Sequence, residues 1–222
     1  MRKAIATVIL VSTVSLLSPA STRACGGKGL WGPEHDELNQ AARSIERGRH
    51  GEAVAQVRRT VKTAAESASP VAGADPWVHN RARQLLALAV ARSAGAVTIA
   101  PGLGGKRKEH RSAAITWAIS AMRADISPRT GQLACELGQC RTLDDPAYTG
   151  ALAEALALVE DSRPEAYRLL KDLGDHDLMP TAQSWAVLAA LHRQRGELEA
   201  GAVALERCRQ QAAKGVRCDV TL

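Results

Sequence analysis

Short segments with apolar side chains at three- and four-residue spacing recur along most of this chain, and glycine, proline or polar residues separate them. Leu38, Ala41 and Ile45 share one face of a helix over residues 36–47, and Gly48 follows it. No long stretch alternates apolar and polar residues with period two, which is the pattern of a half-buried strand. The pattern therefore predicts an all-α fold.

The apolar composition agrees with closely packed helices. Phenylalanine is absent, aromatic residues make up 3% of the chain, and alanine and leucine dominate the apolar set. Small side chains let helix backbones approach each other, whereas sheets favour β-branched and aromatic residues. We therefore expect an interior of helices that cross at short distances.

The helical segments come in pairs. After a Gly-rich lead-in over residues 25–35, we expect one α-helical domain over residues 36–222. Its hairpins are expected at about 36–68, 77–125, 147–173 and 181–213. Pro101 and several glycines interrupt the second hairpin, and a loop over residues 126–146 precedes the third.

The last pair carries large, small and turn-forming residues in a distinctive order: Trp185, Leu188, Ala189, His192, Gly196 and Gly201. This order and spacing resemble the tetratricopeptide repeat. Small residues of the second helices occur at Ala53, Ala114, Ala166 and Gly201, at spacings of 61, 52 and 35 residues. Only the last spacing is near the 34-residue period of that family. The alternative is a non-repetitive helical bundle with chance matches to the motif.

The resemblance implies antiparallel helix hairpins stacked as a short, right-handed solenoid. In the family, the first helices of successive repeats line a groove that holds a protein or peptide partner. Carried over to this chain, the groove is lined by Gln183, Ala186, Ala190, Arg193 and Gln194 in the last hairpin and by Leu38, Ala42 and Glu46 in the first. The expected function is a non-catalytic interaction scaffold, and the sequence does not identify its partner.

The first 24 residues have the layout of a secretory signal peptide. Basic Arg2 and Lys3 precede a 14-residue apolar run and a small-residue end, with cleavage expected after Ala24. The run is short for a membrane span, which needs about 20 residues. We therefore expect an exported protein, in the periplasm, at the outer membrane or secreted. Cleavage leaves 26 basic and 23 acidic residues, a small positive charge that gives no reason to expect nucleic acid binding.

Five cysteines follow the expected cleavage site, an odd number. Cys135 with Cys140 and Cys208 with Cys218 form two sequence-local pairs that are candidate disulfides in an oxidising compartment. The alternative for Cys208 is a buried thiol. Cys25 is a candidate for lipidation, although Arg23 and Thr22 fit the lipoprotein pattern poorly. The second functional hypothesis is therefore a lipid-anchored accessory subunit of a bacterial envelope complex, with membrane contact only through Cys25 or the signal peptide.

No motif predicts catalytic, metal-binding or cofactor-binding residues. The glycine-rich run at 102–106 lacks the first glycine and the final Ser or Thr of a phosphate-binding loop. The six histidines are dispersed, and no Gly-x-Ser-x-Gly or metal-binding cysteine pair occurs. We expect no enzyme activity and no cofactor. A small exported hydrolase with an unrecognised site is the third hypothesis.

Overall fold

The computed structural model describes residues 32–70, 72–126, 145–212, 218–220 and 222. These residues belong to one unit, Trp31–Leu222. Helices account for all the regular structure in the described ranges, apart from an isolated β-bridge between Ala100 and Leu103. The prediction of an all-α fold is confirmed. The expected signal peptide, Cys25, and the Cys135 and Cys140 pair lie outside the described residues.

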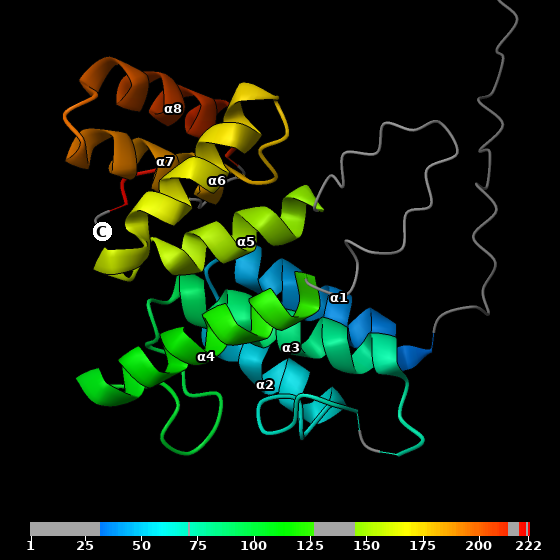
Figure 1. Cartoon of the computed structure of the whole chain (residues 1–222). Coiled ribbons are helices and arrows are strands. Elements are labelled where there is room, and N and C mark those ends of the chain that lie inside the picture. Colours follow the sequence, from blue (N-terminus) through cyan, green and yellow to red (C-terminus); the bar gives the residue numbers. More distant parts are fainter. Residues whose placement is uncertain (1–31, 71, 127–144, 213–217, 221) are drawn as a thin grey trace, which may run out of the picture. The chain divides into compact units, whose positions relative to one another are not determined.

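The helices follow one another as hairpins, each made of a first and a second helix (Figure 1). Their bounds are α1 Pro33–Glu46, α2 His50–Thr60, α3 Pro76–Arg92, α4 Lys108–Ile126, α5 Pro146–Leu156, α6 Arg163–Asp175, α7 Ala182–Gln194 and α8 Leu198–Gln211. A short 3₁₀ turn, η1 Glu160–Ser162, leads into α6.

Side-chain caps mark where three of the first helices begin. The carboxylates of Asp75 and Asp145 accept hydrogen bonds from the amides of Trp77 and Ala147, at 2.8 and 3.0 Å. A proline follows each aspartate at the first helical position, where its missing N–H costs nothing. Thr181 caps α7 by accepting from the Ser184 amide at 3.1 Å.

The hairpins stack side by side in chain order. Besides the contacts within each hairpin, every second helix packs on the next first helix: α2 on α3, α4 on α5 and α6 on α7. The first helices also contact each other in sequence, α1 with α3, α3 with α5 and α5 with α7, while second helices make no comparably extensive contacts among the described residues. The first helices therefore form a continuous row, the arrangement of a helical-repeat protein.

The second helix of each hairpin buries a small residue at one position. Ala53, Ala114 and Ala166 are fully buried in α2, α4 and α6. Gly201 takes the same place in α8, where an added methyl carbon would lie 3.3 Å from the Ala189 carbonyl oxygen. These are the small positions predicted from the repeat-like spacing, and their burial explains why larger side chains are absent there.

Among the described residues, no helix combines the length and the apolar character needed to cross a lipid bilayer.

Candidate functional site

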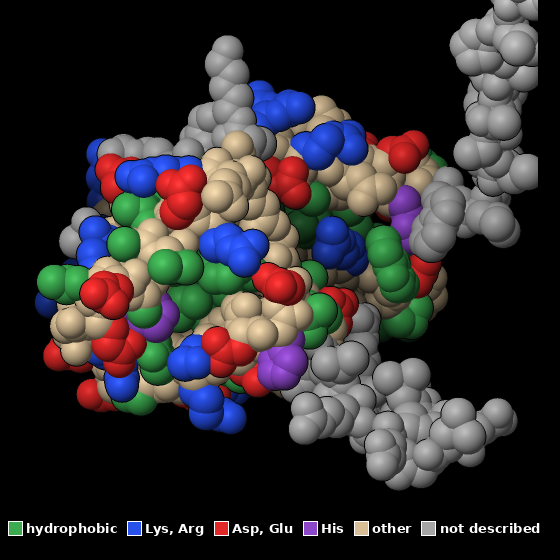
Figure 2. Space-filling model, turned by 90° about the horizontal axis from the view of Figure 1, so that it is seen from above, with side chains coloured by type: hydrophobic (Ala, Val, Ile, Leu, Met, Phe, Trp, Pro, Cys, Tyr) green, Lys and Arg blue, Asp and Glu red, His purple; other side chains and the backbone are tan. Residues whose placement is uncertain are grey.

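A hollow of about 200 Å³ opens where three successive first helices meet. Its walls come from Asn39 of α1, from Trp77, Arg81 and Gln84 of α3, and from Tyr148 of α5. Figure 2 shows a hollowed face on which hydrophobic and basic side chains meet. Because the row of first helices brings these residues together from distant parts of the chain, the hollow depends on the stacking of three hairpins.

The local sequence sets the aromatic walls of the hollow. Asp75 and Pro76 start α3, so Trp77 falls in its first turn, where its side chain is 41% exposed. The Trp77 indole stacks on the His35 imidazole, with ring centroids 4.1 Å apart and 18° between the planes. Tyr148 occupies the corresponding first turn of α5, after the Asp145 cap.

Arg81 adds a cationic group one turn beyond Trp77. Its Nη1 donates to the Gln84 side-chain oxygen at 2.6 Å, which orients the guanidinium at the hollow. Flat aromatic walls beside a guanidinium suit a group with an apolar body and a carboxylate or carbonyl end. The volume is below the range of about 300–1,000 Å³ that is usual for small-molecule and cofactor sites, so the hollow suits one side chain.

The groove residues predicted from the repeat resemblance lie at two separate places, on α1 and α7. Leu38 and Ala186 are fully buried, and Ala190 is 4% exposed, so none of the three is open to solvent in this structure. Ala186 packs with Cys218 and Val220 from the end of the chain. Spacing alone cannot assign an apolar stripe on a helix to a core or to a groove, so the role of these residues in a groove stays a prediction. Exposed or half-buried positions are Ala42, Glu46, Gln183, Arg193 and Gln194.

Two predicted groove residues at the end of α7 form hydrogen bonds to the chain's own C-terminal residues. Arg193 Nη2 donates to the Val220 carbonyl oxygen at 3.0 Å, and Gln194 Nε2 donates to that of Leu222 at 3.4 Å. The predicted groove residues of α1 and α7 are therefore not brought together into one open surface.

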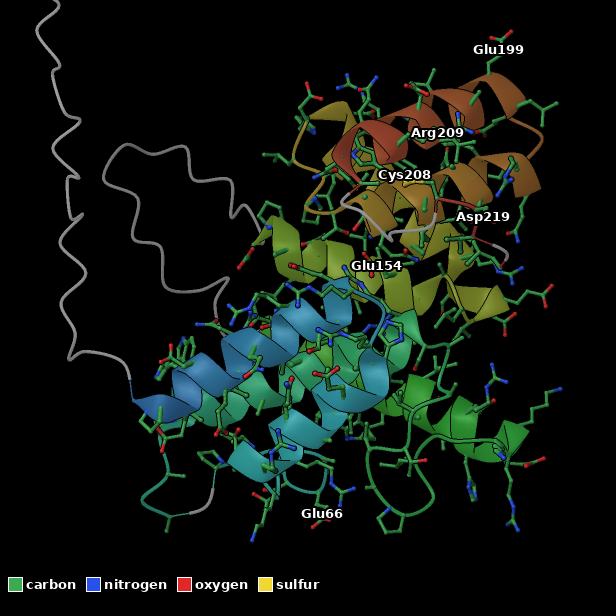
Figure 3. The ribbon with its side chains drawn as sticks, turned by 180° about the vertical axis from the view of Figure 1, so that it is seen from behind. Glu66, Glu154, Glu199, Cys208, Arg209 and Asp219 are labelled. Atoms are coloured by element: carbon green, nitrogen blue, oxygen red, sulfur yellow. A yellow bond between two sulfur atoms is a disulfide. The ribbon has the colours of Figure 1, made fainter. Side chains whose placement is uncertain are left out.

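Cys208 and Cys218 form the predicted disulfide, with sulfur atoms 1.97 Å apart and Cα atoms 5.9 Å apart. Figure 3 shows Cys208 on the side of α8 that faces α7, and its side chain is fully buried. The alternative of a buried free thiol is thereby excluded. The disulfide joins the end of the chain to the last hairpin.

A buried polar cluster joins three of the first helices and was not predicted. Arg92 of α3 donates from Nε to Glu154 of α5 at 2.9 Å, and their side chains are 10% and 3% exposed. Ser184 and Thr181 at the start of α7 donate to the same carboxylate at 2.7 and 3.1 Å. Figure 3 shows Glu154 in the interior, unlike the outward-pointing Glu199. Several donors satisfy this buried charge, so the cluster acts as a structural junction.

His50 of α2 lies within electrostatic reach of that junction. Burial lowers the pKa of His50 below its usual value, and the positive charge of Arg92 lowers it further. The neutral imidazole is therefore favoured in the folded protein. A lone acidic residue, Glu154, within the apolar run ALAEALAL is the one feature of the sequence that indicates the junction. The sequence does not indicate that its partner is Arg92, 62 positions away.

A second cluster forms around Glu197, at the turn between α7 and α8. Its carboxylate accepts from Arg195 Nε at 2.8 Å and from the Tyr167 hydroxyl at 2.8 Å, and lies 2.7 Å from His192 Nδ1. Arg195, followed by His192 and Tyr167, lowers the pKa of Glu197 to about 2. The Arg195 guanidinium also lies 4.3 Å from the centre of the Tyr167 ring. This cluster ties α6 to the last hairpin.

A shallow basic hollow of about 420 Å³ lies at the end of α2, lined by Arg58, Arg59, Lys62 and Glu66 among others. The four named side chains are exposed, and Glu66 introduces an opposite charge. Within the described ranges, no three His, Cys, Asp or Glu side chains are grouped so that they could hold a metal ion.

No protein-family model, curated protein or solved structure matches this chain.

Proposed function

We propose that this protein is an exported, non-catalytic interaction scaffold of tetratricopeptide-like design, which binds a segment of a protein partner along its row of first helices. The observation that carries the proposal is the hollow lined by α1, α3 and α5. One hairpin alone offers a peptide only a few contacts. Three successive first helices together offer a surface large enough to hold a peptide segment.

The chemistry of the hollow suggests what it would hold. Trp77, which is 41% exposed, supplies flat, rigid contact area at low cost in side-chain entropy. Tyr148 adds a mostly buried wall, at 8% exposed, and Arg81 supplies hydrogen-bond donors in a fixed plane. Aromatic residues and arginine are the types most enriched at the centres of protein interfaces. The matching partner segment presents an acidic or carboxyl-terminal group next to an apolar one.

The disulfide between Cys208 and Cys218 supports export, because such bonds persist in oxidising compartments. The basic start and apolar run of residues 1–24 support the same destination. Mass spectrometry of the mature protein separates the soluble form from the lipid-anchored alternative. A diacylglycerol adduct on Cys25 would support the anchor, and an unmodified Cys25 at the mature N-terminus would exclude it.

Selection from a random peptide library tests the proposed surface even while the partner is unidentified. The intact protein is expected to enrich peptides with an acidic or terminal carboxylate group, and Trp77→Ala is expected to abolish their binding. Leu198→Ala is the matched control, since Leu198 is 68% exposed on α8, away from the hollow. Peptides that bind Trp77→Ala as well as the parent protein would refute the proposed surface.

A further inference from the structure

The last residues of the chain form a segment that lies against α7. We call Cys218, Asp219, Val220 and Leu222 the C-terminal segment. Cys218 and Val220 pack in one apolar cluster with Ala182 and Ala186 of α7 and with Cys208. Arg193 and Gln194, near the other end of α7, donate to the Val220 and Leu222 carbonyl oxygens. The segment therefore extends along the helix from its first turn towards its last.

The contacts have the character of peptide recognition. Both hydrogen bonds reach backbone carbonyl oxygens, so they would hold any extended segment with a suitable path. Ala182 and Ala186 lie four residues apart in this cluster, and their small side chains leave room for a chain to approach the helix closely. Side-chain selectivity comes from the position of Val220, which is half-buried against these alanines.

The disulfide is the main connection that keeps the C-terminal segment against α7. Arg193, Gln194 and Asp219 are exposed, and the bond to Leu222 is 3.4 Å long. Cys218, in contrast, is bonded covalently to Cys208, ten positions earlier. A short covalent connection gives a local concentration in the millimolar range, so weak contacts are enough to keep the segment in place.

We propose that this face of α7 is a binding site for extended peptides with aliphatic side chains, and that the chain's own C-terminal segment is its resident occupant. The segment acts as an intramolecular competitor, and a partner peptide must displace it. The inference does not rest on the function proposed above, because the hollow on α1, α3 and α5 shares no residue with this face.

The test compares the intact oxidised chain with a chain that ends at Asp219 and keeps the disulfide. The probe is a fluorescent peptide of residues 220–222, the part of the segment that the shortened chain lacks, and binding is followed by anisotropy. We expect the shortened chain to bind the probe saturably and at least about ten-fold more tightly than the intact chain, because its competitor is gone. Arg193→Ala with Gln194→Ala in the shortened chain is expected to remove that gain.

Arg209→Ala is the matched control, since Arg209 is an exposed arginine of α8 whose guanidinium lies 3.5 Å from the Glu206 carboxylate on the same helix. Equal affinity of the intact and shortened chains, or no binding by a folded shortened chain, would show that the segment is only a structural cap. If the shortened chain does not fold, amide exchange in the intact chain decides. A saturating concentration of the probe should displace the segment and accelerate amide exchange at residues 219–222. Unchanged exchange would overturn the inference.

Discussion

At the scale of single residues, two clusters of charge join neighbouring hairpins. Glu154 is a buried carboxylate with three donors from two other helices, and Glu197 is a more exposed carboxylate with Arg195, Tyr167 and His192 around it. Both clusters join residues from different hairpins. They therefore set how one hairpin sits on the next, in addition to the apolar contacts between them.

Removing one partner of the buried pair should destabilise the fold strongly. Arg92→Ala leaves the Glu154 carboxylate buried without its cation, which we expect to cost about 3–5 kcal/mol in the free energy of unfolding. Arg123→Ala is the matched control, because its ion pair with Glu165 is exposed and is expected to contribute at most about 1 kcal/mol. Urea unfolding monitored by circular dichroism measures both, and similar losses in the two variants would contradict the assignment.

The low pKa of Glu197 predicts how stability depends on pH. A carboxyl group whose pKa is about 2 in the folded protein and 4.5 without these partners stabilises the fold above pH 4.5. That contribution is lost as the pH falls from 4.5 through 2. The stability difference between the parent protein and Glu197→Gln should therefore shrink across this range. Glu199→Gln, an exposed neighbour on α8, serves as control, and a difference that stays constant would exclude the predicted linkage.

At the scale of elements, the helix hairpins could be predicted from sequence because each signal is local. Apolar spacing, Gly48 and Gly196, and the two Asp-Pro caps all lie within or beside the element that they define. The groove residues could not be predicted in the same way. Leu38 and Ala186 lie on an apolar stripe, and whether that stripe meets the core or a partner depends on neighbours that are distant in sequence. The pairing of Arg92 with Glu154 could not be predicted for the same reason, because the two residues are distant in sequence.

Close approach between α5 and the start of α7 predicts opposite effects for two glycines. A methyl group on Gly150 of α5 would lie 2.5 Å from the Pro180 ring, whereas one on Gly51 of α2 would meet nothing within 4 Å. Gly150→Ala should destabilise the protein by about 1–3 kcal/mol through overpacking. Gly51→Ala should leave stability unchanged or raise it by up to about 1 kcal/mol, through helix propensity. Thermal or urea unfolding of both variants checks the sign, and a stabilising Gly150→Ala would refute the tight contact.

At the scale of the whole molecule, lateral stacking creates a surface that no single hairpin has. The hollow on α1, α3 and α5 draws on residues from Asn39 to Tyr148, and the core clusters run through every hairpin. Sequence could indicate stacked helices, but it could not locate this surface, since Trp77, Arg81 and Tyr148 belong to no shared motif. The proposed scaffold function depends on that surface being the place where a partner lies.

Site-specific photo-crosslinking in the producing cells tests this claim most directly. A photoreactive residue replaces Asn39, which is exposed beside the hollow, or Val203, which is 63% exposed on α8. If the row of first helices holds the partner, the Asn39 position will form one discrete adduct with an exported protein, Trp77→Ala will abolish that adduct, and the Val203 position will not form it. An equal yield of the same adduct from Val203, or an Asn39 adduct that survives Trp77→Ala, would contradict the account.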